Sequence, residues 1–433
     1  MARGNPARPV LRGPRDGNAP GLPDHHDIAV VDRDGKLLAR RRVSDEAAGL
    51  TQLLALLAEH GDSAGDLIPV AIETPRGLLV ACLRVTGRKI YPINPMAVAR
   101  YRDRHSVAGR KSDHGDAVVL ANVLRTDIDM HRPLPADSEL AQAIAVLARA
   151  QQDAVWDRTQ AHNKLRSHLR EYYPGFLAAY HGARDGIMRP EARAVLAAAP
   201  TPAAAAKLTV TQLRGLLNKA GRRRGTDTEA TRLRDAFRLP QMRQLPLVED
   251  AMGRRAVALL RQLDAACVAA DDLERAVTQS FNLHPDAGII TSFPGLGPLT
   301  GARVLAEIGD DRSRFCDAKG LKAYAGAAPI TRASGKTRSV TYRRVKNNRL
   351  NAAGYNWAFS ALTASPGARA HYDRRKDVGD RHAAAQRNLF SRSAACTTAW
   401  PPASTTTRPP RSPPRQRSPP QPDNTNSSQP LDS

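Results

Sequence analysis

Three carboxylates in the first third of the sequence have the types and spacing of a metal site. Glu73 follows the apolar run at 70–72, and Asp113 and Asp116 stand three residues apart at the start of a predicted helix. Residues three apart share one face of a helix, and a helix amino terminus stabilises acids. Carboxylates bind Mg²⁺, and two such ions can stabilise the attacking and leaving oxygens of phosphoryl transfer. The acids therefore predict such a site. The alternative is that Asp113 is only an N-cap, Asp116 an acid favoured in the first turn of a helix, and Glu73 a surface residue at the end of a strand.

The charge balance indicates a polyanionic partner for this chemistry. The 433 residues include 65 Lys+Arg against 42 Asp+Glu, a formal net charge of +23. A field of this sign attracts nucleic acid by steering and by counterion release. An arginine-rich protein without such a partner is the alternative, and the motifs must decide between the two.

Membrane and disulfide classes are not indicated. The four cysteines form no C-x-x-C pair, so neither a zinc module nor a disulfide framework is expected. No apolar stretch approaches the roughly 20 residues that span a bilayer, and the amino terminus lacks the apolar core of a signal peptide. We expect a cytoplasmic protein.

The elements that must position the acids alternate strands and helices. The predicted elements are a strand at 28–32, an Asp34-Gly35 hairpin turn, a strand at 36–43, a helix capped by Ser44 and ending near Gly61, a strand at 67–72, a helix at 78–86, a strand at 89–93, a helix at 95–102 and a helix at 114–125. The order β-β-α-β-α-β-α, with acids after the third strand and on the last helix, is the ribonuclease-H-like arrangement. That arrangement expects one more strand in front.

A long helix is predicted from Ser138 to Tyr173, where apolar residues recur at helical spacing without Pro or Gly. Arg158, His162, Arg166 and Arg170 fall on a four-residue spacing that we interpret as one face for a phosphate backbone. A solvated charged face is the alternative. Residues 181–285 read as helices interrupted by prolines and include an Arg222–Arg224 run, to which the sequence assigns no chemistry.

The segment 290–308 predicts a helix-hairpin-helix element. Its Gly295-Leu296-Gly297 turn would let backbone amides approach a phosphate at the start of the second helix. Such a turn contacts the backbone of DNA rather than its bases. A tight turn within a helical bundle is the alternative.

The sequence also resembles a known family, the DEDD insertion-sequence transposases. The stretches that carry the resemblance are DHHDIAVVDRDG, VAIETPRGLLV, YPINPMAVARYRDRHSVAGRKSDHGDAVVLANVLRTD and LARAQQDAVWDR, and it spans about residues 24–392. It implies a RuvC-like amino-terminal domain in which Glu73, Asp113 and Asp116 are the second, third and fourth metal-binding acids. It also implies a recombinase guided by a non-coding bridge RNA.

For the carboxy-terminal part, the resemblance implies that Ser334 attacks a DNA phosphate and holds the strand as a phosphoserine. Without the resemblance, a serine before glycine is a turn residue. Basic residues that suit phosphates surround it: Lys336, Arg338, Arg343, Arg344, Lys346 and Arg349. No nearby His or Asp offers a conventional base, so metal-bound water or hydroxide, or Asp116, is the better candidate for the proton acceptor.

The chain departs from the family at the first acid. The family places an Asp on an apolar strand just before the segment that matches residues 24–27, where this chain has residues 17–23, a Gly/Pro-rich stretch without Asp. Such a stretch cannot form a central strand. Asp24 and Asp27 are the acids that could replace it. A frame change before residue 24 would explain the difference, and another near Phe390 would explain the Pro-rich tail.

These observations predict an α/β domain followed by mainly helical parts. We expect a disordered amino terminus at 1–23, a RuvC-like domain lacking its first strand at 24–130, a helical arm and middle region at 131–285, a transposase domain at 286–392 and a disordered tail at 393–433. The expected reaction is Mg²⁺-dependent cleavage and rejoining of DNA by a homo-oligomer, a dimer or tetramer. The family resemblance implies that its active sites are shared between subunits. The alternatives are a decayed copy that only binds nucleic acid and a structure-selective Mg²⁺-dependent nuclease.

Overall fold

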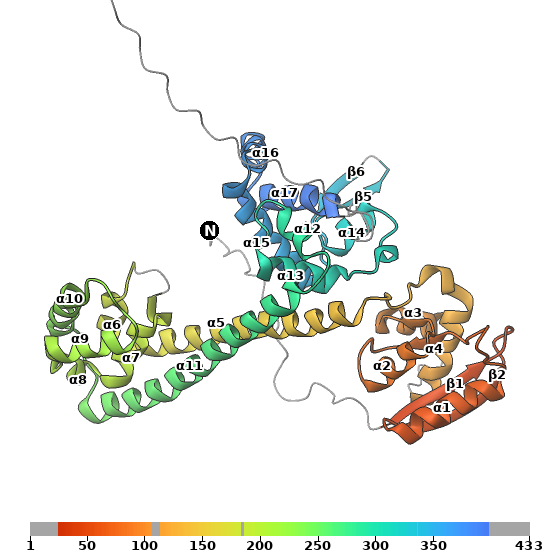
Figure 1. The fold of residues 1–433 in the computed structure, drawn as a ribbon, viewed down its shortest axis with the longest axis horizontal. Coiled ribbons are helices and arrows are strands. Elements are labelled where there is room, and N and C mark those ends of the chain that lie inside the picture. The colour runs from red at the N-terminus through yellow and green to blue at the C-terminus, as the bar shows by residue number, and fades with distance from the viewer. Residues whose placement is uncertain (1–24, 106–112, 183–185, 336, 398–433) are drawn as a thin grey trace, which may run out of the picture. The chain divides into compact units, whose positions relative to one another are not determined.

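The computed structural model describes residues 25–105, 113–182, 186–335 and 337–397. Within the helices, the side chains of His105, Asp113, His114 and residues 395–397 are not described. Contacts divide the chain into two units, one ending at Ala136 and one beginning at Asp137 (Figure 1). The predicted amino-terminal segment 1–23 and most of the predicted tail lie outside the described residues.

The first unit alternates strands and helices in the predicted order. Its elements are β1 (His25–Val31), β2 (Leu37–Ser44), α1 (Ala47–Glu59), β3 (Val70–Ile72), α2 (Leu78–Val85), β4 (Ile90–Pro92), α3 (Pro95–His105), α4 (Asp113–Asp127) and the 3₁₀ turn η1 (Ile128–Met130). β1 and β2 pair antiparallel, and β3 and β4 pair parallel. The α/β class is therefore confirmed for this unit.

Helices cover both faces of these strands. Val30 of β1 and the partly buried Val70 of β3 pack in one core with the leucines of α1 and α2, whereas Ala71 packs against α3 and α4. Successive strand residues point to opposite faces, so the alternation of Val70 and Ala71 serves both helical layers. No ladder joins β1 to β3 within the described residues. The described part of the first unit therefore contains two separate ladders, β1–β2 and β3–β4.

The hairpin between β1 and β2 is confirmed, but its connection is longer than predicted. The ladder ends at the pair Val31–Leu37, so residues 32–36 form a loop instead of a two-residue turn. The Asp32 carboxylate accepts hydrogen bonds from two backbone N–H groups of this loop, at 2.9 and 2.8 Å. An aspartate that bonds its own following backbone favours such a loop over the tight turn.

The predicted helix cap at Ser44 is wrong. Ser44 is the last residue of β2 and pairs with His25, and α1 begins after Glu46, whose side chain makes no capping hydrogen bond. The ladder thus takes precedence over the local capping preference of serine. The predicted end of this helix is confirmed, because Gly61 directly follows the C-cap His60 with φ +95°.

Two long helices, α5 (Glu139–Tyr172) and α11 (Pro246–Asn282), pack side by side in the second unit (Figure 1). The Ser138 hydroxyl accepts a hydrogen bond from the Ala141 N–H and so caps α5 as predicted. Pro246 occupies the first turn of α11, where its missing N–H costs no hydrogen bond.

Short helices pack on one end of this pair, and we call residues 173–245 the arm tip. They are α6 (Pro174–Ala179), the 3₁₀ turn η2 (Gly186–Met188), α7 (Pro190–Ala198), α8 (Pro202–Ala206), α9 (Val210–Lys219) and α10 (Thr226–Arg238). Their core includes Leu165 and Leu169 of α5 and the stacked rings of Phe176 and Phe237, whose centroids are 6.0 Å apart. The arm tip therefore has a hydrophobic core of its own.

The other end of the pair carries what we call the C-terminal core, residues 286–397. Its elements are α12 (Ala287–Ser292), α13 (Pro298–Ile308), the 3₁₀ turn η3 (Arg312–Arg314), α14 (Ala318–Tyr324), β5 (Ile330–Ser334), β6 (Thr337–Thr341), α15 (Asn348–Ala364), α16 (Pro366–Asp377) and α17 (His382–Thr397). Trp357, Phe390 and Ala394 are buried here together with Ile144 and Ala148 of α5. The folded part thus continues past Phe390.

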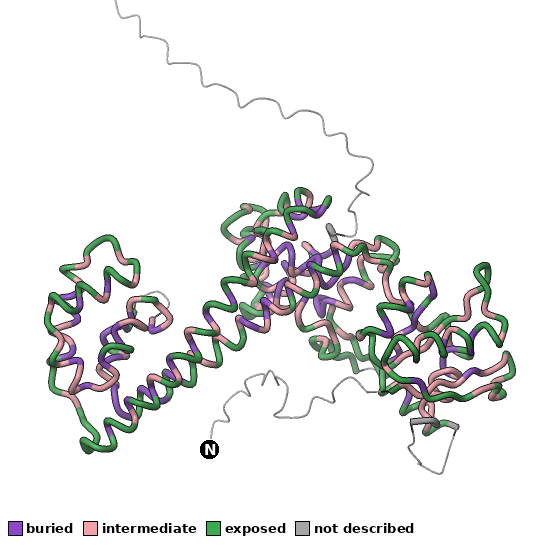
Figure 2. Tube along the Cα trace, turned by 60° about the horizontal axis from the view of Figure 1, so that its bottom comes forward, coloured by how far each residue is buried: buried purple, intermediate pink, exposed green. Residues whose placement is uncertain are grey.

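Burial gathers at the two ends of the α5–α11 pair (Figure 2). Ala148 belongs to one core and Leu165 to the other, which separates the two cores by roughly 25 Å at 1.5 Å per residue. Among the described helices, none is long and apolar enough to cross a membrane.

Candidate active site and nucleic-acid-binding residues

The predicted metal-binding acids all lie in the first unit. Glu73 directly follows β3 at the carboxyl end of the strand, and it is exposed. Asp113 and Asp116 occupy the first turn of α4, and α4 contacts both β1 and β3. The elements that carry the three acids therefore pack together, with Asp113 described in its backbone only.

Asp116 has a partner that the sequence did not reveal. Its carboxylate forms an ion pair with Arg102 of α3, and the two side chains are only 16% and 20% exposed. A carboxylate removed from water needs a partner of this kind. A cation bound at Asp116 would share the carboxylate with this guanidinium. No local motif marks Arg102, because the pair joins two helices through their packing.

The donor set fits a divalent cation in type. Carboxylate oxygens are the ligands that Mg²⁺ prefers, and the helix amino terminus at Asp113 and Asp116 suits acids. Among the described side chains, which leave out Asp113, no group of three acids, histidines or cysteines lies close enough to hold a metal ion. Glu73 and Asp116 would each contribute a carboxylate to such a set.

The two candidate replacements for the first acid differ in what the structure describes. Asp24 lies outside the described residues. Asp27 lies in β1 and accepts two hydrogen bonds from Arg42 of β2, at 3.0 Å from Nε and 2.8 Å from Nη2. Its side chain is 6% exposed. The Asp27 carboxylate is thus held by a cross-strand ion pair.

Ser334 lies at the tip of an exposed hairpin. It ends β5 and pairs with Thr337 of β6, so a two-residue turn joins the strands. Gly335 has φ +54°, the conformation that such hairpin turns require. Every described residue from Thr331 to Thr341 is exposed. The Ser334 hydroxyl is therefore accessible to a large substrate.

The hairpin separates the neighbouring arginines by face. Residues two apart on a strand share a face, so Arg332 lies on the same face as Ser334. Arg338 pairs with Ala333 and lies on the opposite face. The sequence predicted Arg338 as a phosphate ligand and overlooked Arg332, whose place beside Ser334 follows from the register.

The other predicted phosphate ligands follow β6. Arg344 lies over the ring of Tyr342, 5.9 Å from its centroid, and is exposed. Arg343 is half-buried, and the Lys346 Nζ donates to its carbonyl oxygen at 3.4 Å. Lys336 lies outside the described residues. Arg343 and Arg344 therefore differ in how accessible they are to a ligand.

A buried carboxylate anchors the end of this basic segment. Glu307 of α13 accepts hydrogen bonds from Arg149 of α5 at 2.8 Å and from the Asn347 amide at 2.6 Å. The bond to Glu307 raises the pKa of Arg149. Asn347 also caps α15 by accepting the Leu350 N–H. The network ties α5, α13 and α15 together below the serine hairpin.

Arg349 adds a second link to α5. Its guanidinium donates to both carboxylate oxygens of Asp153, at 2.7 and 2.8 Å, and lies 5.1 Å from the ring centroid of Trp156. An arginine paired and stacked in this way holds two elements together. Arg349 therefore has a structural role in addition to its predicted contact with phosphate.

The segment predicted as a helix-hairpin-helix forms the consecutive helices α12 and α13, and the two glycines between them differ. A Cβ at Gly295, which has φ +83°, would lie 2.5 Å from the backbone nitrogen of Ala361. Gly297 is exposed, precedes α13 and has open space where its Cβ would lie. Gly295 thus serves packing against α15, and Gly297 is the glycine at which a phosphate has access.

The three predicted arginines of α5 do not share one face. Each residue turns a helix by 100°, so a four-residue step adds 40° and the row winds around the axis. Arg158 forms an ion pair with Asp271 of α11 at 3.5 Å. Arg166 and Arg170 are exposed. Arg158 therefore faces the partner helix while the other two face solvent.

Comparison with known proteins decides the family. Residues 23–174 match the DEDD transposase model of IS110 elements, described as "Transposase", and residues 287–373 match the model "Transposase IS116/IS110/IS902 family". A Streptomyces coelicolor protein with the name "Mini-circle putative transposase for IS117" is 64% identical over 368 residues, which cover 85% of this chain and 89% of that protein. The chain belongs to the IS116/IS110/IS902 transposase family.

More distant relatives of this transposase come from other insertion elements. An uncharacterised 42 kDa protein of IS900 from Mycobacterium paratuberculosis is 30% identical over 394 residues, covering 89% of this chain and 94% of the relative. An uncharacterised 43.6 kDa protein of IS110 from Streptomyces coelicolor is 27% identical over 384 residues, covering 84% and 87%. The match is therefore to whole insertion-element proteins.

Family membership makes the chain an enzyme of the transposase class and implies a RuvC-like fold for the first matched segment. That segment includes Glu73, Asp113 and Asp116, and the second matched segment includes Ser334. Most of the arm tip lies between the two matched segments.

Proposed function

We propose that this transposase cleaves DNA at the ends of its insertion element and rejoins the strands through Ser334. The Ser334 oxygen attacks a backbone phosphorus, forms a phosphoserine bond and displaces the strand end as a free hydroxyl. The serine proton passes to a base such as Asp116, and the leaving oxygen takes up a proton. Attack on the phosphoserine by another strand end reverses the step and rejoins the DNA without an external energy source.

Glu73, Asp113 and Asp116 would hold the divalent cations of this reaction, two Mg²⁺ ions in the proposal. Bound there, the cations would stabilise negative charge at the phosphate. Three observations support the assignment: the acid-bearing elements pack together, the side chains are of the right type, and all three lie in the DEDD-matched segment. Arg102 would hold Asp116 in position.

The acids and the serine lie in different units of the chain, so the proposal must say which subunit supplies each. We therefore include a homo-oligomer, a dimer or tetramer, in which acids of one subunit meet Ser334 of another. The net charge of +23 supports DNA and a non-coding bridge RNA as partners. The RNA would select the sequences that are joined.

One observation carries the proposal: Ser334 stands at the exposed tip of a hairpin, with Arg332 on its face, inside the transposase-matched segment. The test mixes full-length protein, Mg²⁺, element-end DNA and RNA transcribed from the non-coding end of the element. Denaturing gels should show a covalent protein–DNA adduct whose modified peptide contains Ser334.

Ser334→Ala should remove the adduct and lower joining by roughly 10³-fold or more, since loss of a nucleophile has effects of this size. Ser339→Ala is the matched control, an exposed serine on the same face of the hairpin. An adduct that persists in Ser334→Ala, or equal losses in both variants, would contradict the nucleophile. Loss of joining with Mg²⁺-dependent cutting retained would indicate the structure-selective nuclease.

A second candidate is a copy that binds nucleic acid without cleaving it. The occupied Asp27 carboxylate and the Gly/Pro-rich segment 17–23, where the family has an acidic strand, favour it. The same assay on a chain with that strand restored separates the two. Activity that appears only after restoration supports the decayed copy, whereas equal activity in both chains supports the active transposase.

A further inference from the structure

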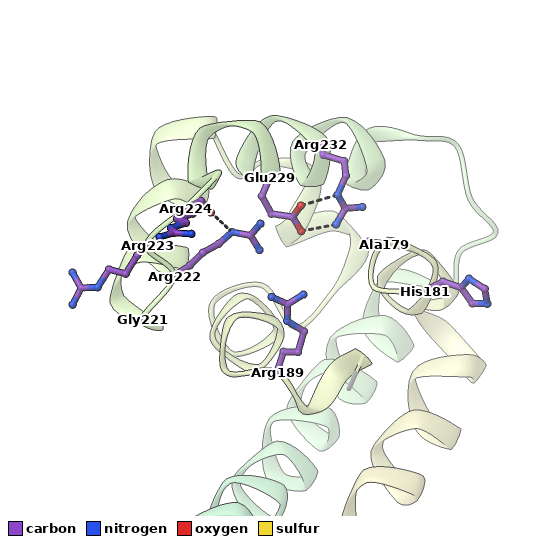
Figure 3. A pocket seen from close by; sticks show the side chains of 9 residues that line it. All are labelled: Ala179, His181, Arg189, Gly221, Arg222, Arg223, Arg224, Glu229 and Arg232. Atoms are coloured by element: carbon purple, nitrogen blue, oxygen red, sulfur yellow. Dashed lines mark hydrogen bonds and ion pairs between the residues drawn. The ribbon is translucent and has the colours of Figure 1, made fainter. Parts of the chain in front are cut away.

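A cavity of about 680 Å³ in the arm tip is lined mainly by arginines. Its walls come from the end of α6, the segment before α7, the connection between α9 and α10, and α10 itself (Figure 3). We call its five arginines the arginine pocket: Arg189, Arg222, Arg223, Arg224 and Arg232. None of the residues proposed for catalysis contributes to it.

The pocket has an excess of positive charge. Among the residues that the structure describes, its five guanidinium groups meet two carboxylates: Glu229 in the lining, and Glu191, which pairs with Arg189 at 2.9 Å and lies 3.9 Å from Arg222. Arginine keeps its proton at any physiological pH, and the hydrogen bond from Arg232 holds the pKa of Glu229 below its ordinary value. Three positive charges therefore stay uncompensated, and an anion would relieve their repulsion.

Three of the five arginines, Arg189, Arg222 and Arg232, are held in place before any ligand arrives. Arg232 donates to both oxygens of Glu229, at 2.7 and 3.0 Å, and the Arg222 Nε donates to the Arg224 carbonyl at 3.1 Å. Figure 3 shows Arg189 and Arg222 directed toward the Glu229–Arg232 pair. Guanidinium groups fixed in this way lose little conformational freedom when they bind an oxyanion.

The backbone of the arginine run is fixed by glycines on both sides. Gly221 and Gly225 have φ +94° and +62°, in the left-handed region where other residues are strained. The Arg222 N–H donates to the Leu217 carbonyl at 3.0 Å, which ties the run to the end of α9. The run is thus a defined turn between two helices.

The walls lack the means to recognise a base. Ala179 is the one apolar side chain among the lining residues, none of which is Phe, Tyr or Trp, and Figure 3 shows the one ring in the lining, His181, turned away from the arginines. Proteins that bind bases stack them on aromatic rings, whereas arginine forks match the oxygens of phosphates. The lining therefore suits a phosphate backbone rather than a nucleoside.

We propose that the arginine pocket binds phosphate groups of a nucleic-acid strand, so that the arm tip is a backbone-binding site separate from the reacting residues. The site lies roughly 25 Å along α5 from the C-terminal core, which corresponds to about seven base pairs of duplex. RNA and DNA share the phosphodiester chemistry that the pocket recognises. Contacts of this kind position a strand without reading its sequence.

The test measures binding by full-length protein without Mg²⁺, so that it does not depend on strand cleavage or on Ser334. Fluorescence anisotropy measures binding of a labelled RNA hairpin and, in a separate titration, of a labelled DNA duplex. Arg222→Gln/Arg224→Gln is compared with Arg255→Gln/Arg261→Gln, which removes the same charge from exposed positions of α11 outside the pocket lining.

The pocket variant should bind at least about tenfold more weakly and lower the salt slope by about 1.5, since each lost phosphate contact removes roughly 0.7–0.9. The control should change affinity less than about threefold. The nucleic acid whose affinity falls more in the pocket variant, the RNA hairpin or the DNA duplex, is identified as the ligand. Arg224→Glu repeats the test with a single substitution. Arg224 is exposed and has no ion pair among the described residues, so this variant should fold like the wild type.

Equal losses in the two double variants would reduce the effect to net charge and overturn the proposal. Unchanged binding in the pocket variant would do the same. Poly-glutamate tests for an acidic protein partner. If it binds the wild type but not the pocket variant, and does not displace RNA or DNA from the wild type, the pocket serves such a partner and the proposal is wrong.

Discussion

The serine hairpin and the arginine pocket both present positive charge, but in opposite ways. On the hairpin, Arg332 and Arg338 stand on exposed strands and have no ion-pair partner among the described residues. In the pocket, Arg189, Arg222 and Arg232 are held by carboxylates or carbonyls on packed helices. The hairpin must order its side chains when it meets a strand, whereas the pocket is already ordered.

This difference separates two tasks. A preformed pocket suits a contact that persists through the reaction, because little freedom is lost on binding. Exposed, loosely held arginines suit a site that takes up and releases strand ends. A destabilising substitution in the core of the arm tip should therefore leave the C-terminal core unchanged, and a substitution in the C-terminal core should leave the arm tip unchanged.

The largest effect is expected in the core below the pocket. Phe237 is 2% exposed and stacks on Phe176. Phe237→Ala should lower the local stability of the arm tip by about 3–5 kcal/mol, the usual loss for a buried phenylalanine. Hydrogen exchange should rise in α9 and α10 but not in β5 or α15, with Phe359→Ala, an exposed phenylalanine, as the control. A uniform rise over both regions would contradict the separation.

A smaller effect is expected in the C-terminal core, which carries the hairpin. Gly295→Ala would place a Cβ 2.5 Å from the Ala361 nitrogen in a backbone with φ +83°. The strain should lower the free energy of unfolding of the C-terminal core by about 2–3 kcal/mol, seen as a lower Tm and faster exchange in α15. Gly297→Ala has open space and should leave Tm within about 1 °C. Equal shifts in the two variants would show that the packing at Gly295 does not matter.

The smallest effect tests the order within the pocket. The hydrogen bond from Arg232 lowers the pKa of Glu229, so the pair stabilises the fold above the ordinary glutamate value of 4.5 and loses this contribution as pH falls through the lower folded pKa. Glu229→Gln should cost less than about 1 kcal/mol at pH 7, because Arg232 is half-exposed. The Tm difference from wild type should shrink as pH falls below 4.5, while Glu171→Gln, an exposed glutamate, should show no difference over the same range. A difference that grows as pH falls would contradict the assignment.

Sequence patterns predicted the elements that depend on local spacing. The apolar period and the cap at Ser138 gave α5 nearly to the residue, and the alternation of strands and helices gave the first unit its class. Local reasoning failed where a distant partner decided the outcome. Ser44 pairs with His25 in a ladder, and the Asp32 side chain shapes a loop that the Asp-Gly pair alone does not specify.

The site residues also divide into those that local sequence predicts and those that depend on packing between distant segments. Glu73 and Ser334 were marked by their neighbours in the sequence, but Arg102 meets Asp116 only because α3 packs on α4. The arginine pocket gathers residues from four segments of the arm tip, and its one local signal was the Arg222–Arg224 run. Gly295 shows the converse case, a motif glycine whose conformation is also required by packing against α15.

The lengths of α5 and α11 set the distance between the arm tip and the C-terminal core. Two helices packed side by side fix the separation of whatever they carry at their ends, in steps set by the number of residues. Removal of seven residues from each would draw the arm tip about 10 Å toward the C-terminal core and keep nearly the same facing sides in contact. With a strand bound in the arginine pocket as proposed, the length of the arm would set a distance along that strand, about three base pairs for every seven residues of helix.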